Sequence, residues 1–262
     1  MIWLLTFSTF STAFGFVVND LSDAELDRSA GVIRNPVSTG ELSRGRCISV
    51  ALLLLLVSIA ALYRLSFRNR LLGMVVIFLY FTYSWIVRAK ARPMLDVAYH
   101  GLCLAILATM GYTEYRPFDV DCLLGVSIVF LLSAMSQVLQ EIRDYETDRN
   151  MIKTTVTSLG KRRSLVLCLA FLASAFFISL LLLSNGSVPL EVLLLAPLTY
   201  FIIAPITQAV FNEEHVDKML KEIQEKRLIM IALLLTALIL GRIYAPLAWL
   251  EQVLKNVVIG AP

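Results

Sequence analysis

Long apolar blocks separated by short polar segments dominate the chain. Eight blocks are long enough to cross a membrane as helices: residues 1–18, 47–64, 70–87, 96–113, 119–139, 164–184, 188–211 and 228–248. A helix needs roughly 20 residues to cross about 30 Å of hydrocarbon. Because backbone groups in lipid must be satisfied within their own segment, we expect these blocks to form helices. The pattern predicts an all-α polytopic membrane protein with about eight transmembrane helices in a single domain, residues 1–262.

The composition agrees with this pattern. Hydrophobic residues make up 58% of the chain and charged residues 16%, with a mean hydropathy of +0.76, whereas a soluble domain carries about 25% charged residues. No basic patch with interleaved aromatic residues indicates a nucleic-acid partner, and nothing implies a protein partner. No Lys or Arg precedes Arg28, so the first block lacks the basic start of a signal peptide and is expected to remain in the protein.

The distribution of Lys and Arg predicts the orientation. Segments 20–46, 88–95, 140–163 and 212–227 fall on one side of the predicted helices and hold 17 of the 23 basic residues, while the other side holds 6. Basic residues are enriched in cytoplasmic loops. We therefore expect a cell-membrane protein whose first side faces the cytoplasm and whose two ends, as given, lie outside.

The segment after the first block carries an acidic motif, Asn19-Asp20-Leu21-Ser22-Asp23-Ala24-Glu25-Leu26-Asp27. Spacings of three, four and seven residues place Asp20, Asp23 and Asp27 on one face of a helix. Like charges at that spacing repel each other, so the face favours a counter-charge. Mg²⁺ typically takes one or two carboxylates together with oxygens of a bound phosphate.

A second acidic motif follows the fifth block. Asp144 and Asp148 form an i,i+4 pair within Gln140-Glu141-Ile142-Arg143-Asp144-Tyr145-Glu146-Thr147-Asp148-Arg149. Four predicted helices separate the two motifs, so both are expected on the cytoplasmic face. Two acidic clusters on one face, each followed by basic residues, suit a diphosphate bridged by Mg²⁺. The competing interpretation is a pair of solvated acidic loops.

These residues resemble a known family. Asn19 to Asp27 matches the N-D-x-x-D-x-x-x-D motif of the UbiA-type intramembrane prenyltransferases, and Asp144 to Asp148 resembles their second aspartate motif. The run from Asp148 to Gly160 resembles the usual continuation, and Asn35 to Gly40 resembles the P-x-x-S-G element. The stretch from Tyr83 through Arg88, Lys90, Arg92-Pro93 and Asp96 also matches.

The resemblance implies a helical bundle around a central cavity, with cytoplasmic cap helices that carry the motifs. It implies Mg²⁺-dependent transfer of a prenyl group from an isoprenyl diphosphate to a lipophilic acceptor, with release of diphosphate. The acceptor classes that the resemblance allows are aromatic compounds, quinone precursors, isoprenoids or carotenoids, and glycerol-ether lipids. It also implies that membrane lipid surrounds the protein.

The resemblance also assigns residues. The expected catalytic set is Asp20, Asp23, Asp27, Asp144 and Asp148, and the expected Mg²⁺ ligands are Asp20, Asp23, Asp144 and Asp148. The expected substrate-binding residues are Asn19, Arg28, Tyr83, Arg88, Lys90 and Lys153.

Three features depart from the family pattern. The family usually has nine transmembrane helices, one more than predicted here, and the helix before the first motif begins at Met1. Asn35 stands where an Arg commonly precedes the proline, and Ile152 stands where a Gly is common. These differences concern substrate positioning more than the reaction class.

Two other classes of membrane protein compete with this interpretation. A CDP-alcohol phosphatidyltransferase packs its D-G, A-R, G and paired aspartates into one continuous segment, and neither motif here fits that order. A transporter places ionisable residues near the bilayer midplane, whereas the carboxylates here gather at one end of the predicted helices.

Overall fold

A computed structural model describes residues 2–186, 196–212, 215–221 and 223, and their regular structure is entirely helical. The chain divides into two compact units, Met1–Ser179 and Leu180–Pro262. The first unit contains both acidic motifs. The expectation of one domain over the whole chain stays a prediction.

The long helices of the first unit follow the apolar blocks closely. They are α1 (Ile2–Ser29), α3 (Arg44–Tyr63), α4 (Phe67–Ser84), α5 (Leu95–Thr113), α6 (Val120–Arg143) and α9 (Lys161–Ser184), whose last turns extend past the unit boundary. Short elements connect them: α2 (Pro36–Thr39), the 3₁₀ turn η1 (Ala89–Ala91), α7 (Tyr145–Asp148) and α8 (Thr155–Leu159). In the second unit, α10 covers Ala196–Phe211 and contains Pro205.

Five of these helices, α1, α3, α5, α6 and α9, are long and apolar enough to cross a membrane. They coincide with five of the eight predicted spans and confirm a polytopic α-helical membrane protein. The predicted span 70–87 corresponds to α4, which has 18 residues and carries Arg68 and Arg70 in its first turn. Span 188–211 is described only where it overlaps α10, and span 228–248 lies outside the described residues.

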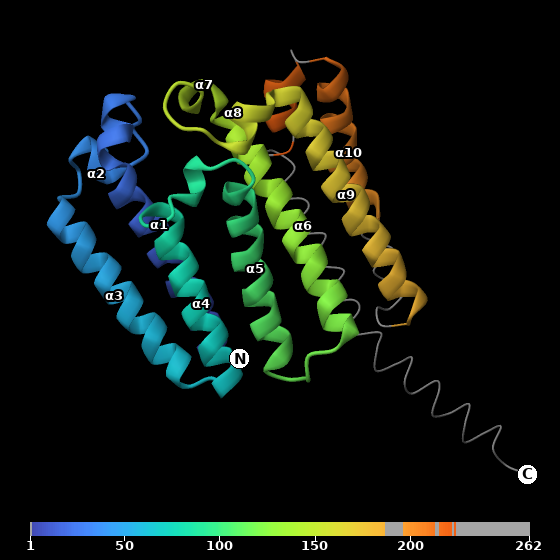
Figure 1. Ribbon diagram of the computed structural model, residues 1–262, viewed down its shortest axis with the longest axis horizontal. Coiled ribbons are helices and arrows are strands. Elements are labelled where there is room, and N and C mark those ends of the chain that lie inside the picture. Colours follow the sequence, from blue (N-terminus) through green and yellow to red (C-terminus); the bar gives the residue numbers. More distant parts are fainter. Residues whose placement is uncertain (1, 187–195, 213–214, 222, 224–262) are drawn as a thin grey trace, which may run out of the picture. The chain divides into compact units, whose positions relative to one another are not determined.

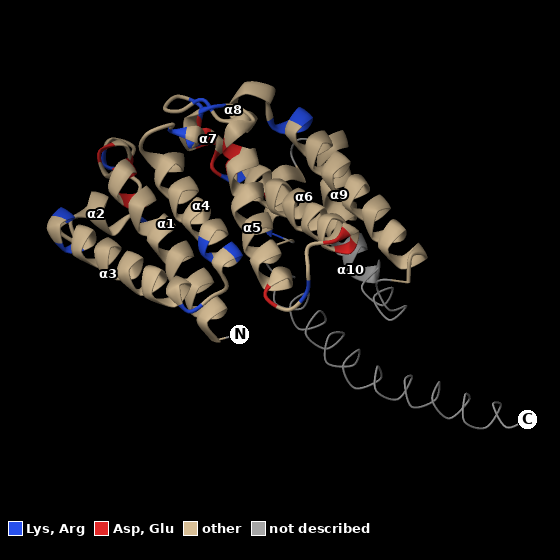
Figure 2. Ribbon diagram, turned by 60° about the horizontal axis from the view of Figure 1, so that its bottom comes forward, with Lys and Arg blue, Asp and Glu red and all other residues tan. Residues whose placement is uncertain are grey.

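Within the first unit, α1 lies between α3 and α4, and α5 lies between α4 and α6 (Figure 1 and Figure 2). Apolar side chains fill the contact between α1 and α3, where Phe14, Val18 and Cys47 are buried. Gly101 lets α5 approach α6 closely, since a Cβ atom there would lie 2.9 Å from the Phe130 ring and 3.0 Å from its backbone oxygen.

Charged residues occupy the ends of the helices and leave their middle stretches uncharged (Figure 2). The short elements α2, η1, α7 and α8 all lie at the same end of the first unit (Figure 1). This end carries both acidic motifs, and the expectation that they share one face of the bundle is confirmed by a contact described below.

Candidate active site

The first acidic motif forms the last turns of α1. The helix continues past the apolar stretch to Ser29 and stops before Gly31, whose φ of +67° ends the helix. The prediction that Asp20, Asp23 and Asp27 lie on one helix is therefore confirmed.

Lys90 is the cation closest to the first motif. From η1, its Nζ pairs with the Asp23 carboxylate and donates to Asn19 Oδ1 (3.2 Å) and Ser22 Oγ (2.6 Å). Only 7% of Lys90 is exposed. Burial lowers the pKa of Lys90 despite the opposing pull of Asp23. The ammonium thus supplies a positive charge at the place where a metal ion or diphosphate would meet the motif.

Asn35 fixes the segment after α1 onto the motif. Its Nδ2 donates to Asp27 Oδ2 (2.7 Å) and to the backbone oxygen of Asp20 (2.9 Å). Its Oδ1 accepts from the backbone nitrogens of Val37 and Ser38 and so caps α2. The asparagine that departs from the family pattern therefore has a structural role here, and its position before Pro36 is the sequence signal for the cap.

The second acidic motif leaves the end of α6 and forms the single turn α7. The Asp148 nitrogen donates to the Asp144 oxygen (3.0 Å), which is the i,i+4 relationship that the spacing predicted. Asp144 accepts a pair of hydrogen bonds from the Arg143 guanidinium, both 3.0 Å long. Burial alone would raise the pKa of Asp144, but Arg143 and Arg34 together hold it below its usual value.

An ion pair of Arg34 connects the two motifs, and the carboxylates of one motif affect the pKa of a carboxyl in the other. Arg34 Nη1, from the segment after α1, lies 3.3 Å from Asp144 Oδ2. Burial raises the pKa of the Asp148 carboxyl to about 6, and the charge of Asp144 adds to the effect. Asp23 and Asp27 of the first motif also raise this pKa, while Arg34 opposes them. Carboxylates from both motifs therefore lie within electrostatic reach of one another.

A hard divalent cation fits this donor set. In the described part of the chain, no three His, Cys, Asp or Glu side chains gather closely enough to hold a metal by themselves. Mg²⁺ does not require such a cage, because it usually takes one or two carboxylates and completes its shell with water and phosphate oxygens. After burial, the charges of Asp144, Asp23 and Asp27 also raise the pKa of Asp148, and a cation would relieve this repulsion.

The other expected substrate-binding residues lie in different settings. Arg28 donates to the backbone oxygens of Ser38 (3.2 Å) and Val37 (3.3 Å), so it braces α2. Arg88 is exposed beside Lys90 and has a φ of +49°. The Tyr83 hydroxyl lies 3.5 Å from Gln137 Nε2 on α6.

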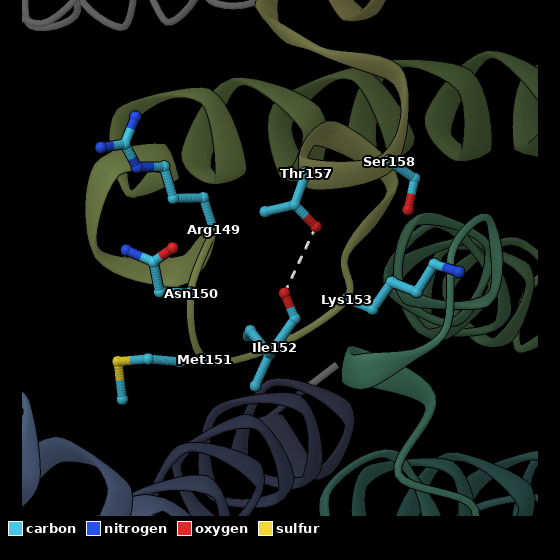
Figure 3. A pocket seen from close by; sticks show the side chains of 7 residues that line it. All are labelled: Arg149, Asn150, Met151, Ile152, Lys153, Thr157 and Ser158. Atoms are coloured by element: carbon cyan, nitrogen blue, oxygen red, sulfur yellow. Dashed lines mark hydrogen bonds between the residues drawn. The ribbon is translucent and has the colours of Figure 1, made fainter.

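Lys153 lines a pocket in the loop between α7 and α8. The pocket has a volume of about 350 Å³ and is lined by Arg149, Asn150, Met151, Ile152, Lys153, Thr157 and Ser158. Figure 3 shows Arg149 and Lys153 extending in opposite directions. Arg149 also pairs with Glu146 (3.1 Å). Lys153 is therefore the cation of this loop that has no ion-pair partner among the described residues.

Sequence reasoning missed a buried polar cluster below these loops. Asp96 on α5, Glu141 on α6 and Thr155 on α8 are 0%, 5% and 0% exposed. Thr155 donates to Asp96, and the next residue, Val156, donates to Glu141. A signal was present, since an acidic residue inside or at the end of an apolar helix requires a partner.

Comparisons with known proteins agree with the geometry. The profile of the UbiA prenyltransferase family matches residues 1–219. Coumarin 8-geranyltransferase 1 of Citrus limon is 27% identical over 190 residues, which are 65% of this chain and 45% of that protein. Digeranylgeranylglyceryl phosphate synthase of Methanosphaera stadtmanae is 27% identical over 142 residues, 53% of this chain and 50% of that protein. The chain thus spans about half the length of these relatives.

A solved structure shares the fold. The UbiA homolog from Archaeoglobus fulgidus, bound to GPP and Mg²⁺, superposes with a TM-score of 0.67 at 20% identity. The superposition covers 90% of this chain and 86% of that one.

Proposed function

The chain belongs to the UbiA prenyltransferase family, and on this basis we propose that it transfers a prenyl group from an isoprenyl diphosphate to a lipophilic acceptor and releases diphosphate. The observation that carries the proposal is the meeting of the two acidic motifs through Arg34 and Asp144, with Lys90 against the first motif. Membership in this enzyme family sets aside the transporter and the CDP-alcohol phosphatidyltransferase.

Asp20, Asp23, Asp144 and Asp148 would hold Mg²⁺. When bound, Mg²⁺ would neutralise the charge that develops on the leaving diphosphate. Support comes from the Archaeoglobus fulgidus homolog, whose structures include complexes of Mg²⁺ with GPP and with DMAPP.

The basic side chains of the chain would bind the diphosphate oxygens. Lys90 and Arg34 lie against the carboxylates, and Arg88 and Lys153 are cations of the neighbouring loops. Preorganised donors of this kind stabilise charge that develops in the transition state. The apolar helices below would hold the isoprenoid tail and exclude water from the allylic carbon.

Two finer features belong to the same proposal. The 17-to-6 distribution of basic residues supports a cytoplasmic location for this end of the bundle. The names of the relatives contain two different acceptors, a coumarin and a glyceryl phosphate. The proposal therefore names the acceptor only as a lipophilic compound.

The test is donor turnover by the purified protein in lipid nanodiscs, using labelled geranyl diphosphate and Mg²⁺ with extracted lipids and a coumarin as acceptors. We expect diphosphate release and a labelled prenyl product, both removed by Asp148→Asn. Glu146→Gln is the matched control, because Glu146 lies between the two aspartates and pairs with Lys161 and Arg149 instead. Equal losses in the two variants, or Mg²⁺-independent turnover, would contradict the proposal.

A further inference from the structure

A hydrogen-bonded cluster of buried side chains ties three segments together below the acidic motifs. It consists of Asp96 at the start of α5, Glu141 near the end of α6 and Thr155 at the start of α8. All three are at least 95% buried. Buried polar groups of this kind persist only when each has a partner.

Asp96 accepts hydrogen bonds at both of its oxygens. Oδ2 accepts from the Thr155 nitrogen (2.6 Å), and Oδ1 accepts from the Thr155 hydroxyl (2.5 Å) and the Val97 nitrogen (2.8 Å). Three donors aimed at one carboxyl favour its ionised form.

Glu141 is the second buried carboxyl of the cluster, and one of the two carboxyls must carry a proton. Its Oε1 accepts from Gln137 Nε2 (3.1 Å) and its Oε2 from the Val156 nitrogen (3.2 Å), and the carboxyl lies within electrostatic reach of Asp96. Within the described residues, neither carboxyl forms an ion pair with Lys, Arg or His. Two buried carboxylates in contact cannot both stay ionised without a cation. Glu141 is therefore the neutral acid of the pair.

Thr155 also binds the loop that carries Lys90. Its hydroxyl donates to Asp96 and accepts from the Met94 nitrogen (2.6 Å). Met94 has a φ of +68°, which a side-chain-bearing residue keeps only where its surroundings hold it. The loop over residues 85–94 is thereby fixed to α8, which follows Lys153 by two residues.

We propose that Asp96, Thr155 and Glu141 are positioning residues that hold the Lys90 loop and the Asp148–Lys153 loop in fixed register. All three side chains are buried and bonded to one another's segments, so their proposed role is to position the loops and not to contact a ligand. What the loops bind rests on the proposed function, whereas the connection between them is a property of the fold.

Thr155 offers a matched pair of variants. Thr155→Ser keeps the hydroxyl and both of its hydrogen bonds, and Thr155→Val keeps the shape but removes them. We expect Thr155→Val to raise hydrogen exchange in residues 85–95 and 149–160, and to raise the donor KM on the order of 10- to 100-fold with a smaller change in kcat. Thr155→Ser should behave like the unmodified protein in both measurements.

A second pair of variants tests which of the two carboxyls carries the proton. Glu141→Gln should be the milder change, because an amide N–H replaces the proton and the amide oxygen still accepts from Gln137, so that only the hydrogen bond from the Val156 nitrogen is lost. Asp96→Asn should act like Thr155→Val, because its amide nitrogen would have to face one of the two Thr155 donors. The C=O stretch of a protonated carboxyl should disappear from the infrared difference spectrum in Glu141→Gln.

Glu114→Gln is the control for a general loss of stability. Glu114 accepts from Asn69 and Ser66 in a comparable network at the other end of α5, so its variant should leave loop exchange and KM unchanged. The exchange measurement needs no substrate, and it decides on the connection even if the proposed reaction is wrong. Equal exchange in Thr155→Val and Thr155→Ser, or altered exchange with an unchanged KM, would overturn the positioning role.

Discussion

The Arg34 guanidinium lies 3.3 Å from the Asp144 carboxylate although 110 residues separate them in the sequence. The next residue, Asn35, bonds the side chain of Asp27 and the backbone of Asp20. Two consecutive residues therefore join the first acidic motif to the second. Since the Arg34 side chain is 67% exposed, its contact with Asp144 can exchange for a contact with a bound anion.

Arg34→Gln should weaken donor binding by about three- to tenfold, because an exposed charge-assisted contact contributes roughly 1 kcal/mol. The measurement is the donor KM or the Kd of a non-hydrolysable diphosphate analogue. Arg44→Gln is the matched control, since Arg44 pairs only loosely with the exposed Glu25, at 3.9 Å. A donor affinity equally reduced in both variants would mean a general charge effect.

Lys90→Met should destabilise the metal-free protein by about 3 kcal/mol, because it leaves Asp23 next to other carboxylates without its buried cation. Thermal unfolding in detergent with EDTA measures the loss. Mg²⁺ should restore more stability to this variant than to the unmodified protein, since the metal replaces the missing charge. In the double variant Lys90→Met/Asp23→Asn the loss should be smaller. Identical Mg²⁺ responses would show that Lys90 and the metal do not share a site.

The pKa of Asp148 predicts how stability depends on pH. The value is raised from 3.8 to about 6, so the folded protein binds this proton more tightly than the unfolded chain. The resulting stability is fully present below pH 3.8 and is lost as pH rises through about 6. We expect the half-buried site to contribute about 1–2 kcal/mol after solvent screening.

Asp148→Asn removes this dependence. Without Mg²⁺, its Tm should exceed that of the unmodified protein above pH 6, and the difference should shrink toward pH 4. Glu146→Gln controls for other titrating groups on α7, and its difference should not follow the same curve. A constant difference between pH 4 and 8 would mean that Asp148 keeps an ordinary pKa.

The sequence predicted the features that depend on local periodicity. The apolar blocks gave the five membrane-spanning helices, and the i,i+4 spacing gave the turn that joins Asp144 to Asp148. The contacts between distant segments could not be predicted. Lys90 was expected to bind substrate, but its burial against Asp23 depends on how η1 packs on α4 and α5, and no spacing in the sequence records that.

The same limit applies to the buried cluster. Asp96 and Glu141 lie 45 positions apart, and Glu141 belongs to the second acidic motif, for which solvated loops were the competing interpretation. Only the packing of α5 against α6 brings the two carboxyls together away from water. Arg28 illustrates the reverse case, because its position after the motif suggested a ligand contact, whereas its guanidinium binds backbone oxygens of α2.

Gly101→Ala should lower the Tm, since the added methyl group would press on the Phe130 ring and backbone where α5 meets α6. Overpacking of this kind costs about 1–3 kcal/mol. Gly125→Ala is the matched control on α6, because a Cβ atom there meets nothing within 4 Å. Equal Tm values for the two variants would argue against a tight α5–α6 contact at this position.

Asp20→Asn and Asp144→Asn should each reduce turnover on the order of 10²- to 10³-fold while the protein stays folded. The double variant should be little worse than either single one. Independent roles would make the two losses multiply, whereas groups that hold one metal–diphosphate cluster fail as a unit once either is removed. Arg34 and Asn35 support a single cluster, because they connect the two motifs directly. Single-turnover transfer from a labelled prenyl diphosphate measures the effect, with Glu25→Gln on α1 and Glu146→Gln on α7 as controls. Losses that multiply in the double variant would indicate two separate sites, and near-normal turnover in either single variant would remove that aspartate from the mechanism.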